Sequence, residues 1–283
     1  MIPATFDYQA PSSVDDALRL LGESDDAKVL AGGQSLIPLM RLRLAAPEVI
    51  VDIGGIQELR GVRDDGDAIV VGAMTPHADV ITNPLIAEHA RLITEAAKTV
   101  ADPQVRHRGT FGGSLAHADP AGDMPATALA LGAEFVIAGP GGRRTVAVEE
   151  FFQDLFTTAV GEDELLVEVR IPKHTGWGAH YEKFTRVAQQ WSIVGVAAAV
   201  RVQDGSIAEA RVALTNMGST PVRARAVEQA LAGQPATADA VRAAAAAAAE
   251  GTSPPSDTNG DADYRRHLAS VLTGRAVLAA AGG

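Results

Sequence analysis

Apolar positions recur with helical and strand periods along the chain and divide it into three successive groups of predicted elements. The first group, residues 1–57, begins with a helix that Ser12 or Ser13 caps and that Gly22 ends. A short buried strand, a second helix and a second strand follow, at residues 28–33, 36–45 and 48–53. This order predicts a small α/β unit.

The second group, residues 58–175, mixes strands and helices. Its strands are predicted at residues 68–74, 134–139, 143–148 and 164–172, with helices at residues 84–100 and 124–131. The segment Gly139-Pro140-Gly141-Gly142 predicts a hairpin turn, and residues 149–156 are amphipathic. A long glycine-rich loop is expected between the two helices. Residues 172–178 are the best candidate for the next boundary.

The third group, residues 176–283, begins with three strand-like runs at residues 179–186, 193–202 and 207–218. They predict a three-stranded antiparallel meander. Helices are predicted at residues 223–233, 241–250 and 264–281, with a polar, exposed loop at residues 251–262. The pattern therefore predicts an α+β chain whose last part is an α/β domain.

Two glycine-rich segments carry the clearest sign of chemistry. They are LAGGQSL at residues 30–36 and RGTFGGSLAHADPAGD at residues 108–123. Each opens into a helix-like segment, so each is expected to present bare backbone N–H groups to an anion. Two such loops facing one another would hold a diphosphate from both sides. The pair therefore predicts a dinucleotide site.

Composition removes several classes of function. The 283 residues are 47% hydrophobic, which suits a chain with a full core, and the net charge of −11 comes without any Lys/Arg block. Nucleic-acid and anionic-membrane surfaces are therefore not expected. The chain has no cysteine, so any disulfide or cysteine-held iron–sulfur cluster must belong to another subunit. The absence of a signal-peptide pattern and of an apolar span predicts a cytoplasmic protein with no integral membrane segment.

Familiar catalytic motifs do not occur. The sequence lacks G-x-G-x-x-G after a strand and lacks GK[ST], so neither an ordinary Rossmann site nor a P-loop is indicated. Ser35 and Ser114 do not lie in G-x-S-x-G, and the seven histidines have no metal-binding spacing. No catalytic residue and no metal ligand is predicted.

The two glycine-rich segments carry a family resemblance. LAGGQSLIPLM together with GTFGGSLAHADPAGDMP resembles the paired flavin-binding signatures of the medium, FAD-binding subunit of molybdenum hydroxylases, particularly of the aerobic carbon monoxide dehydrogenase type. DYRRHLASVLTGRAV resembles the C-terminal helix of the same subunits. The resemblance implies a two-part FAD-binding domain of the vanillyl-alcohol oxidase/xanthine dehydrogenase type, followed by the family's C-terminal domain.

The resemblance also implies roles for the residues of both segments. The first segment would wrap the FAD diphosphate with backbone amides, a task that requires the close approach glycine allows; its residues are Ala31, Gly32, Gly33, Gln34, Ser35 and Leu36. The second would contact the diphosphate and ribityl portion through Thr110, Gly112, Gly113 and Ser114. Many relatives have Asn in place of Ser114.

Four further residues match cofactor positions, and each has an ordinary structural alternative. Asp123 would bind a sugar hydroxyl, or cap a helix, or do both. Lys28 would lie near FAD, or be a solvated lysine at a strand start. Lys183 would stabilise the reduced anionic flavin, or face solvent from a strand. Trp191 would lie against the isoalloxazine, or be a core tryptophan; Gln190 departs from the acidic residue common there.

The implied enzyme has three kinds of subunit. A large molybdenum-cofactor subunit would oxidise the substrate, and a small iron–sulfur subunit would relay electrons to the FAD of this chain, which would pass them to a quinone or similar acceptor. The complex would be a dimer of heterotrimers, a heterohexamer, in the cytoplasm or at the inner face of the membrane through its partners. Carbon monoxide is the first choice of substrate. Purine, nicotine-like and aldehyde substrates remain open, as do a stand-alone flavin oxidoreductase and a scaffold without cofactor.

Overall fold

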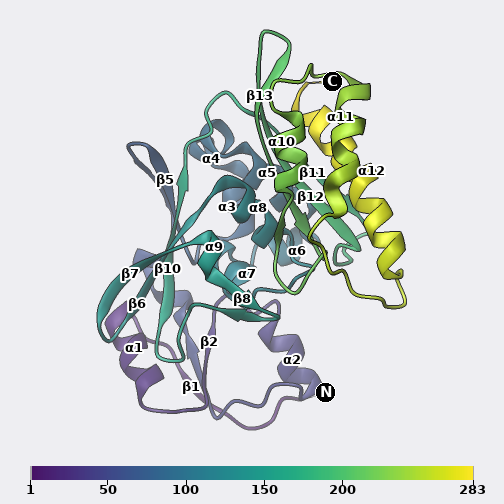
Figure 1. The fold of residues 1–283 in the computed structure, drawn as a ribbon. Coiled ribbons are helices and arrows are strands. Elements are labelled where there is room, and N and C mark those ends of the chain that lie inside the picture. Colours follow the sequence, from purple (N-terminus) through teal and green to yellow (C-terminus); the bar gives the residue numbers. More distant parts are fainter. Residues whose placement is uncertain (1, 283) are drawn as a thin grey trace.

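The structure is a computed structural model that describes residues 2–282. Within these residues the chain forms four β-sheets, one parallel with three strands and the others antiparallel with five, four and two strands. The three larger sheets follow one another along the chain, and the predicted mixture of helices and strands is confirmed (Figure 1). No helix among residues 2–282 has the length and apolar character that crossing a bilayer requires.

The parallel sheet has the order β1-β3-β2. Its elements are β1 (Asp7–Gln9), α1 (Val14–Gly22), β2 (Ala27–Leu30), α2 (Leu36–Leu42) and β3 (Val49–Asp52). Ser13, rather than Ser12, caps α1, because its hydroxyl accepts from the Asp16 amide at 3.1 Å. Helix α2 ends three residues earlier than predicted, because Arg43 adopts a left-handed conformation with φ 59°. Strand β1 was not predicted.

The five-stranded sheet has the order β4-β5-β10-β6-β7. Its strands are β4 (Val62–Asp65), β5 (Ala68–Gly72), β6 (Glu134–Gly139), β7 (Gly142–Ala147) and β10 (Leu165–Pro172). The predicted hairpin is confirmed, with Gly139 opposite Gly142 across a two-residue turn. The amphipathic residues 149–156 split between a short helix, α9 (Val148–Phe151), and the small hairpin of β8 (Phe152–Asp154) and β9 (Thr157–Thr158).

The helices of this second part differ from prediction at several places, and two short ones, at residues 77–82 and 103–106, were not predicted. They are α3 (His77–Thr82), α4 (Pro84–His89), α5 (Arg91–Thr99), α6 (Pro103–Arg106), α7 (Phe111–His117) and α8 (Asp123–Leu131). The prediction of a single helix over residues 84–100 was wrong, because Ala90, with φ −146° and ψ 45°, separates α4 from α5. Both helices then bury their isoleucines, Ile86 and Ile93. The prediction of a long glycine-rich loop was also partly wrong, because residues 111–117 form helix α7.

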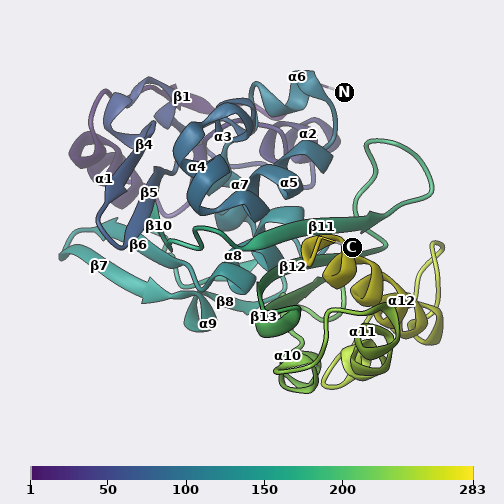
Figure 2. The same ribbon diagram turned by 90° about the horizontal axis from the view of Figure 1, so that it is seen from above.

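The last sheet, β11-β12-β13-β14, contains the predicted meander and a short fourth strand. Its elements are β11 (Gly178–Phe184), β12 (Val194–Gln203), β13 (Ser206–Thr215), β14 (Val222–Arg223), α10 (Arg225–Leu231), α11 (Ala238–Ala245) and α12 (Ala262–Ala280). Helices α10 to α12 cover one face, and α5 and α8 lie against the other (Figure 2). Strand β12 is therefore apolar on both faces: Ala197 and Ala199 pack toward the second part, whereas Val196 and Ala198 pack toward the C-terminal helices.

The first sheet shares a core with the second. Leu21 and Val51 of the first part pack in one cluster with Leu59, Leu165 and Val167. The predicted boundary between residues 57 and 58 falls within a 3-10 helix, Gln57–Leu59. The predicted divisions at 57/58 and 175/176 remain predictions. The shared cores place the turn between β2 and α2 beside helix α7, which brings the two glycine-rich segments together.

Candidate functional site

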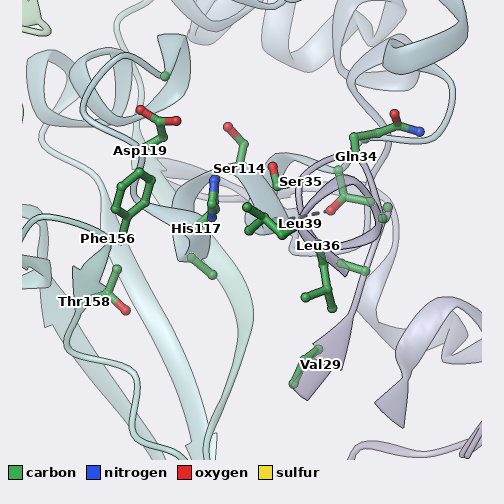
Figure 3. Close-up of a pocket in the computed structure, with 18 of the residues that line it drawn as sticks. Val29, Gln34, Ser35, Leu36, Leu39, Ser114, His117, Asp119, Phe156 and Thr158 are labelled. Atoms are coloured by element: carbon green, nitrogen blue, oxygen red, sulfur yellow. Dashed lines mark hydrogen bonds between the residues drawn. The ribbon is translucent and has the colours of Figure 1, made fainter. Parts of the chain in front are cut away.

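A cavity of about 630 Å³ lies where the β2–α2 turn, helix α7, the β8–β9 hairpin and the end of β11 meet. Figure 3 shows side chains from the first three of these regions around it, including Ser35, Leu36, Ser114 and Phe156. Every residue predicted to bind the cofactor lines this cavity except Gly112. The volume falls in the range of small-molecule and cofactor sites. The structure therefore brings thirteen of the fourteen predicted residues together at one cavity, and their contacts with a cofactor stay predictions.

The turn between β2 and α2 offers backbone donors to the cavity. Gly33 has φ 73°, a left-handed conformation that glycine adopts without strain. In the part of the chain that the structure describes, the N–H groups of Gly32, Gly33, Gln34 and Ser35 have no hydrogen-bond acceptor. Successive free N–H groups in a turn form a concave anion site. The bare backbone donors predicted for this first segment are present.

The stretch at residues 111–114 of the second segment does not offer such donors, so the expectation was wrong for this stretch. The amides of Phe111 and Gly112 donate to the carbonyls of Thr75 and Ala73, each at 2.9 Å. The amides of Gly113 and Ser114 donate to Thr110, at its Oγ1 and its carbonyl, each at 3.1 Å. Thr110 is thus the N-cap of α7. The side-chain hydroxyl of Ser114 lies on the cavity wall in Figure 3 and is available to a ligand.

The glycines of the two segments allow the backbones to pack closely. A Cβ added to Gly32 would lie 2.2 Å from the carbonyl oxygen of Arg108, and one added to Gly112 would lie 2.5 Å from the Cβ of Ala73. Gly112 faces a separate cavity of about 90 Å³ behind the wall. Gly32 and Gly112 therefore hold the two segments together, and any contact of Gly112 with the ligand remains only a prediction.

Asp123 accepts three hydrogen bonds at the floor of the cavity. Its carboxylate receives the Lys183 ammonium at 2.7 Å and the hydroxyls of Tyr181 and Ser192, each at 2.9 Å. The side chains of Asp123 and Lys183 are 4% and 11% exposed. The helix-cap alternative for Asp123 was wrong, because Gly122 is the N-cap of α8. The solvent-facing alternative for Lys183 was wrong as well.

Tyr181 was not found by sequence reasoning. Its hydroxyl lies 3.0 Å from the Thr215 hydroxyl and is buried. Burial and the neighbouring Asp123 carboxylate hold the pKa of Tyr181 well above its usual value, so the group stays neutral and donates. A Cβ on Gly195 would lie 2.5 Å from the same hydroxyl, so Gly195 makes room for it. No local sequence signal connects Tyr181 to an aspartate 58 residues away.

Trp191 and Lys28 lie at the rim of the cavity. The Trp191 side chain is 53% exposed, so the alternative of a core tryptophan was wrong. Lys28 is exposed and forms no ion pair within residues 2–282, which leaves its charge available at the cavity. Contact of either residue with a cofactor stays a prediction. Both positions are compatible with one.

The β8–β9 hairpin supplies a wall that the sequence did not indicate. Phe156 has φ 54° and is 52% exposed, and its ring centroid lies 5.2 Å from that of His117. Thr157 and Thr158 follow on the same wall. Burial lowers the pKa of His117, so this histidine is neutral at pH 7. The hairpin was hidden because residues 149–156 show only an amphipathic pattern.

His77, on the cavity wall, should make the folded protein less stable in acid. It is 3% exposed, its Nδ1 has no partner among the described residues, and burial together with Arg106 lowers its pKa to about 4. Between pH 6.5 and 4 the unfolded chain then binds more protons than the folded one, so the free energy of unfolding falls as pH falls. We expect this residue to account for a loss of up to about 3 kcal/mol.

The measurement is urea unfolding of the wild type and of His77→Leu from pH 7.5 to pH 4.5. The wild type should lose stability more steeply than the variant below pH 6.5, because leucine cannot take up a proton. Parallel curves for the two proteins would show that His77 does not titrate as proposed.

Comparison with known proteins agrees with this geometry. Residues 4–174 match the family model described as the FAD binding domain in molybdopterin dehydrogenase, and residues 179–280 match the CO dehydrogenase flavoprotein C-terminal domain. The carbon monoxide dehydrogenase medium chain of Hydrogenophaga pseudoflava is 45% identical, over 99% of this chain and 98% of that one. The nicotine 6-hydroxylase medium subunit of Paenarthrobacter nicotinovorans is 35% identical, over 96% of each chain.

A solved structure shares the whole fold. Carbon monoxide dehydrogenase from Hydrogenophaga pseudoflava, in a form that lacks the Mo-pyranopterin moiety of its cofactor, superposes with a TM-score of 0.96 and 47% identity over 100% of this chain and 99% of that one. The two family models together span nearly all of the chain. The chain therefore belongs to the family of FAD-binding medium subunits of molybdenum hydroxylases, and it is an oxidoreductase subunit whose cofactor is FAD.

Proposed function

We propose that this chain is the electron-exit subunit of an aerobic carbon monoxide dehydrogenase, in which it passes electrons from an iron–sulfur partner through FAD to a quinone or similar acceptor. The observation that supports this most directly is the cavity with four N–H groups that have no acceptor among residues 2–282, in a chain 45% identical over 99% of its length to such a medium chain.

The residues present fit FAD. Four consecutive backbone donors from Gly32 to Ser35 suit a diphosphate, and the exposed Lys28 adds a positive charge beside them. The cavity volume of about 630 Å³ has room for a large organic cofactor. When bound, FAD can accept electrons singly from a cluster and release two to an organic acceptor.

Lys183 and Asp123 place a fixed positive charge at one side of this cavity. The Lys183 ammonium donates to Asp123 at 2.7 Å and to the Thr99 carbonyl at 3.2 Å. An ammonium has three donors, so one remains for a ligand in the cavity. Because Asp123 and Thr99 fix the nitrogen, its charge is held in place before the cofactor binds. We assign Lys183 to stabilising negative charge on the flavin ring, and Asp123 to holding Lys183.

The partners follow from the family and from the composition. The chain contains no cysteine, so the thiolates of an iron–sulfur cluster would come from a small partner subunit, and the molybdenum cofactor from a large one. We propose a dimer of such heterotrimers in the cytoplasm, attached through its partners to the inner face of the membrane. Carbon monoxide is the proposed substrate of the large subunit.

Isolation of the native complex tests this proposal. An affinity-tagged chain, expressed in its own host, should copurify with two further subunits, molybdenum, iron and FAD, and the complex should reduce a quinone analogue with carbon monoxide. Reduction by nicotine-like, purine or aldehyde substrates instead would assign the chain to another hydroxylase of the family. A lone yellow protein, fully active without molybdenum or iron, would refute the subunit role.

A further inference from the structure

The loop at residues 185–193, between β11 and β12, covers part of the cavity. It brings Gln189, Gln190 and Trp191 to the cavity wall. Residues 186–189 are exposed, and Gln189 has φ 69°, a conformation that costs a non-glycine residue energy. An exposed, strained loop keeps one position only if other parts of the molecule hold it.

The middle of the loop is held by a pair of amide side chains. Gln190 Nε2 donates to Asn259 Oδ1 at 3.2 Å, and Gln190 Oε1 accepts from the Arg186 amide at 3.3 Å. Asn259 lies 69 residues further along the chain, in the connection before α12. The backbone N–H of Asn259 donates to Asp257 Oδ1 at 2.7 Å. The pair carries no charge, unlike an acidic residue at position 190.

The end of the loop is held by a buried arginine. Arg265 of α12 is fully buried; its Nη1 donates to the Ile193 carbonyl, and its Nη2 donates to Asp257 Oδ1 at 2.7 Å. Asn216 Nδ2 adds bonds to the carbonyls of Ser192 and Ile193, at 2.8 Å and 3.3 Å. Burial of a guanidinium is costly unless its bonds compensate. The buried Arg265 therefore links the end of the loop to Asp257, whose side chain is itself 43% exposed.

We propose that Asn259, Asp257 and Arg265 form a clamp that holds the loop at residues 185–193 over the cavity and sets the position of Trp191 against bound FAD. Asn259 and Arg265 are positioning residues: they act through Gln190 and Ile193 and do not line the cavity themselves. The C-terminal helix thereby controls how long the cofactor stays bound. This inference rests on FAD as the ligand of the cavity.

The decisive variant is Asn259→Ala, with Thr258→Ala as the matched control, because Thr258 is an exposed neighbour in the same connection. Both are made in a Trp177→Phe background, where Trp191 is the only tryptophan. In Asn259→Ala we expect tryptic cleavage after Arg186 to become about fivefold to tenfold faster, since one hydrogen bond is lost. Iodide should quench Trp191 more strongly, and FAD should dissociate about fivefold to tenfold faster. Thr258→Ala should match the background.

Two further variants separate positioning from general destabilisation. Asn259→Asp keeps an acceptor for Gln190 and should restore slow cleavage and slow FAD release. Arg265→Lys keeps the charge but cannot reach both acceptors, and it should release the loop, whereas Arg266→Lys, which changes a half-buried residue of the same helix that does not contact the loop, should not.

Unchanged cleavage and quenching in Asn259→Ala would overturn the clamp. A released loop with unchanged FAD dissociation would overturn its role toward the cofactor. If the background protein binds no FAD, the proposed function fails, while the cleavage and quenching results still decide whether the clamp exists.

Discussion

Replacing Gly33 by alanine is expected to weaken FAD binding by about 10- to 100-fold. A non-glycine residue at φ 73° costs about 1–2 kcal/mol, and the new Cβ would lie 2.7 Å from Cδ1 of Ile37. The backbone can relieve both strains only by turning, which re-aims the N–H groups of Gly32 to Ser35 that face the cavity. A factor of ten in affinity corresponds to about 1.4 kcal/mol, so these costs suffice. Titration of the FAD-free protein with FAD, followed by flavin fluorescence, measures the loss.

Gly66→Ala is the matched control for this substitution. Gly66 also has φ 73°, but a Cβ there would meet nothing within 4 Å, and the residue lies in the turn between β4 and β5. It should therefore show a similar loss of stability with unchanged FAD affinity. Equal FAD affinity in Gly33→Ala and the wild type would contradict the assignment of this turn. Gly32→Ala is no substitute, because its Cβ would collide with the backbone of Arg108 and disturb the fold.

Asp123→Ala is expected to lower the free energy of unfolding by about 3–5 kcal/mol, the usual cost of removing one partner from a buried ion pair. The variant would leave the Lys183 ammonium, 11% exposed, without its carboxylate, and would remove an acceptor from Tyr181 and Ser192. Urea unfolding of the FAD-free protein measures the change without a contribution from ligand binding.

The double variant Asp123→Asn/Lys183→Met distinguishes stability from cofactor binding. Asparagine keeps an acceptor for Tyr181 and Ser192, and methionine removes the buried charge, so much of the stability should return. FAD affinity should stay low, because the cavity has lost its fixed cation. If the double variant were as unstable as Asp123→Ala, the ion pair would not be the source of the loss. If it bound FAD normally, the role proposed for Lys183 would be wrong.

The sequence predicted the first glycine-rich segment well because its properties are local. Gly32 and Gly33 lie between a short strand and a helix, and that order alone predicts a tight turn with free amides. In the second segment the amides of Phe111 and Gly112 are taken by Thr75 and Ala73, residues more than thirty positions earlier. Such a partner leaves no trace in the local pattern, so a helix was mistaken for a loop.

For the same reason, the periodicity of the sequence could not predict the Asp123 cluster at the floor of the cavity or the β8–β9 hairpin on its wall. Asp123 and Lys183 were identified only because they match family positions, and nothing in the pattern showed that they form a buried ion pair or that Tyr181 joins them. The break at Ala90 likewise depends on how two short helices pack, since the apolar period continues through it. Long-range packing decides these features.

The cavity lies where three parts of the chain meet, and this gives FAD a role in folding. Its walls come from the first part through Gly33, from the second through Ser114 and from the third through Lys183. A ligand that binds only the assembled joint stabilises the whole chain by mass action, by about 2.7 kcal/mol at a free concentration one hundred times its dissociation constant. A higher concentration of free FAD should therefore raise the folded share of this subunit.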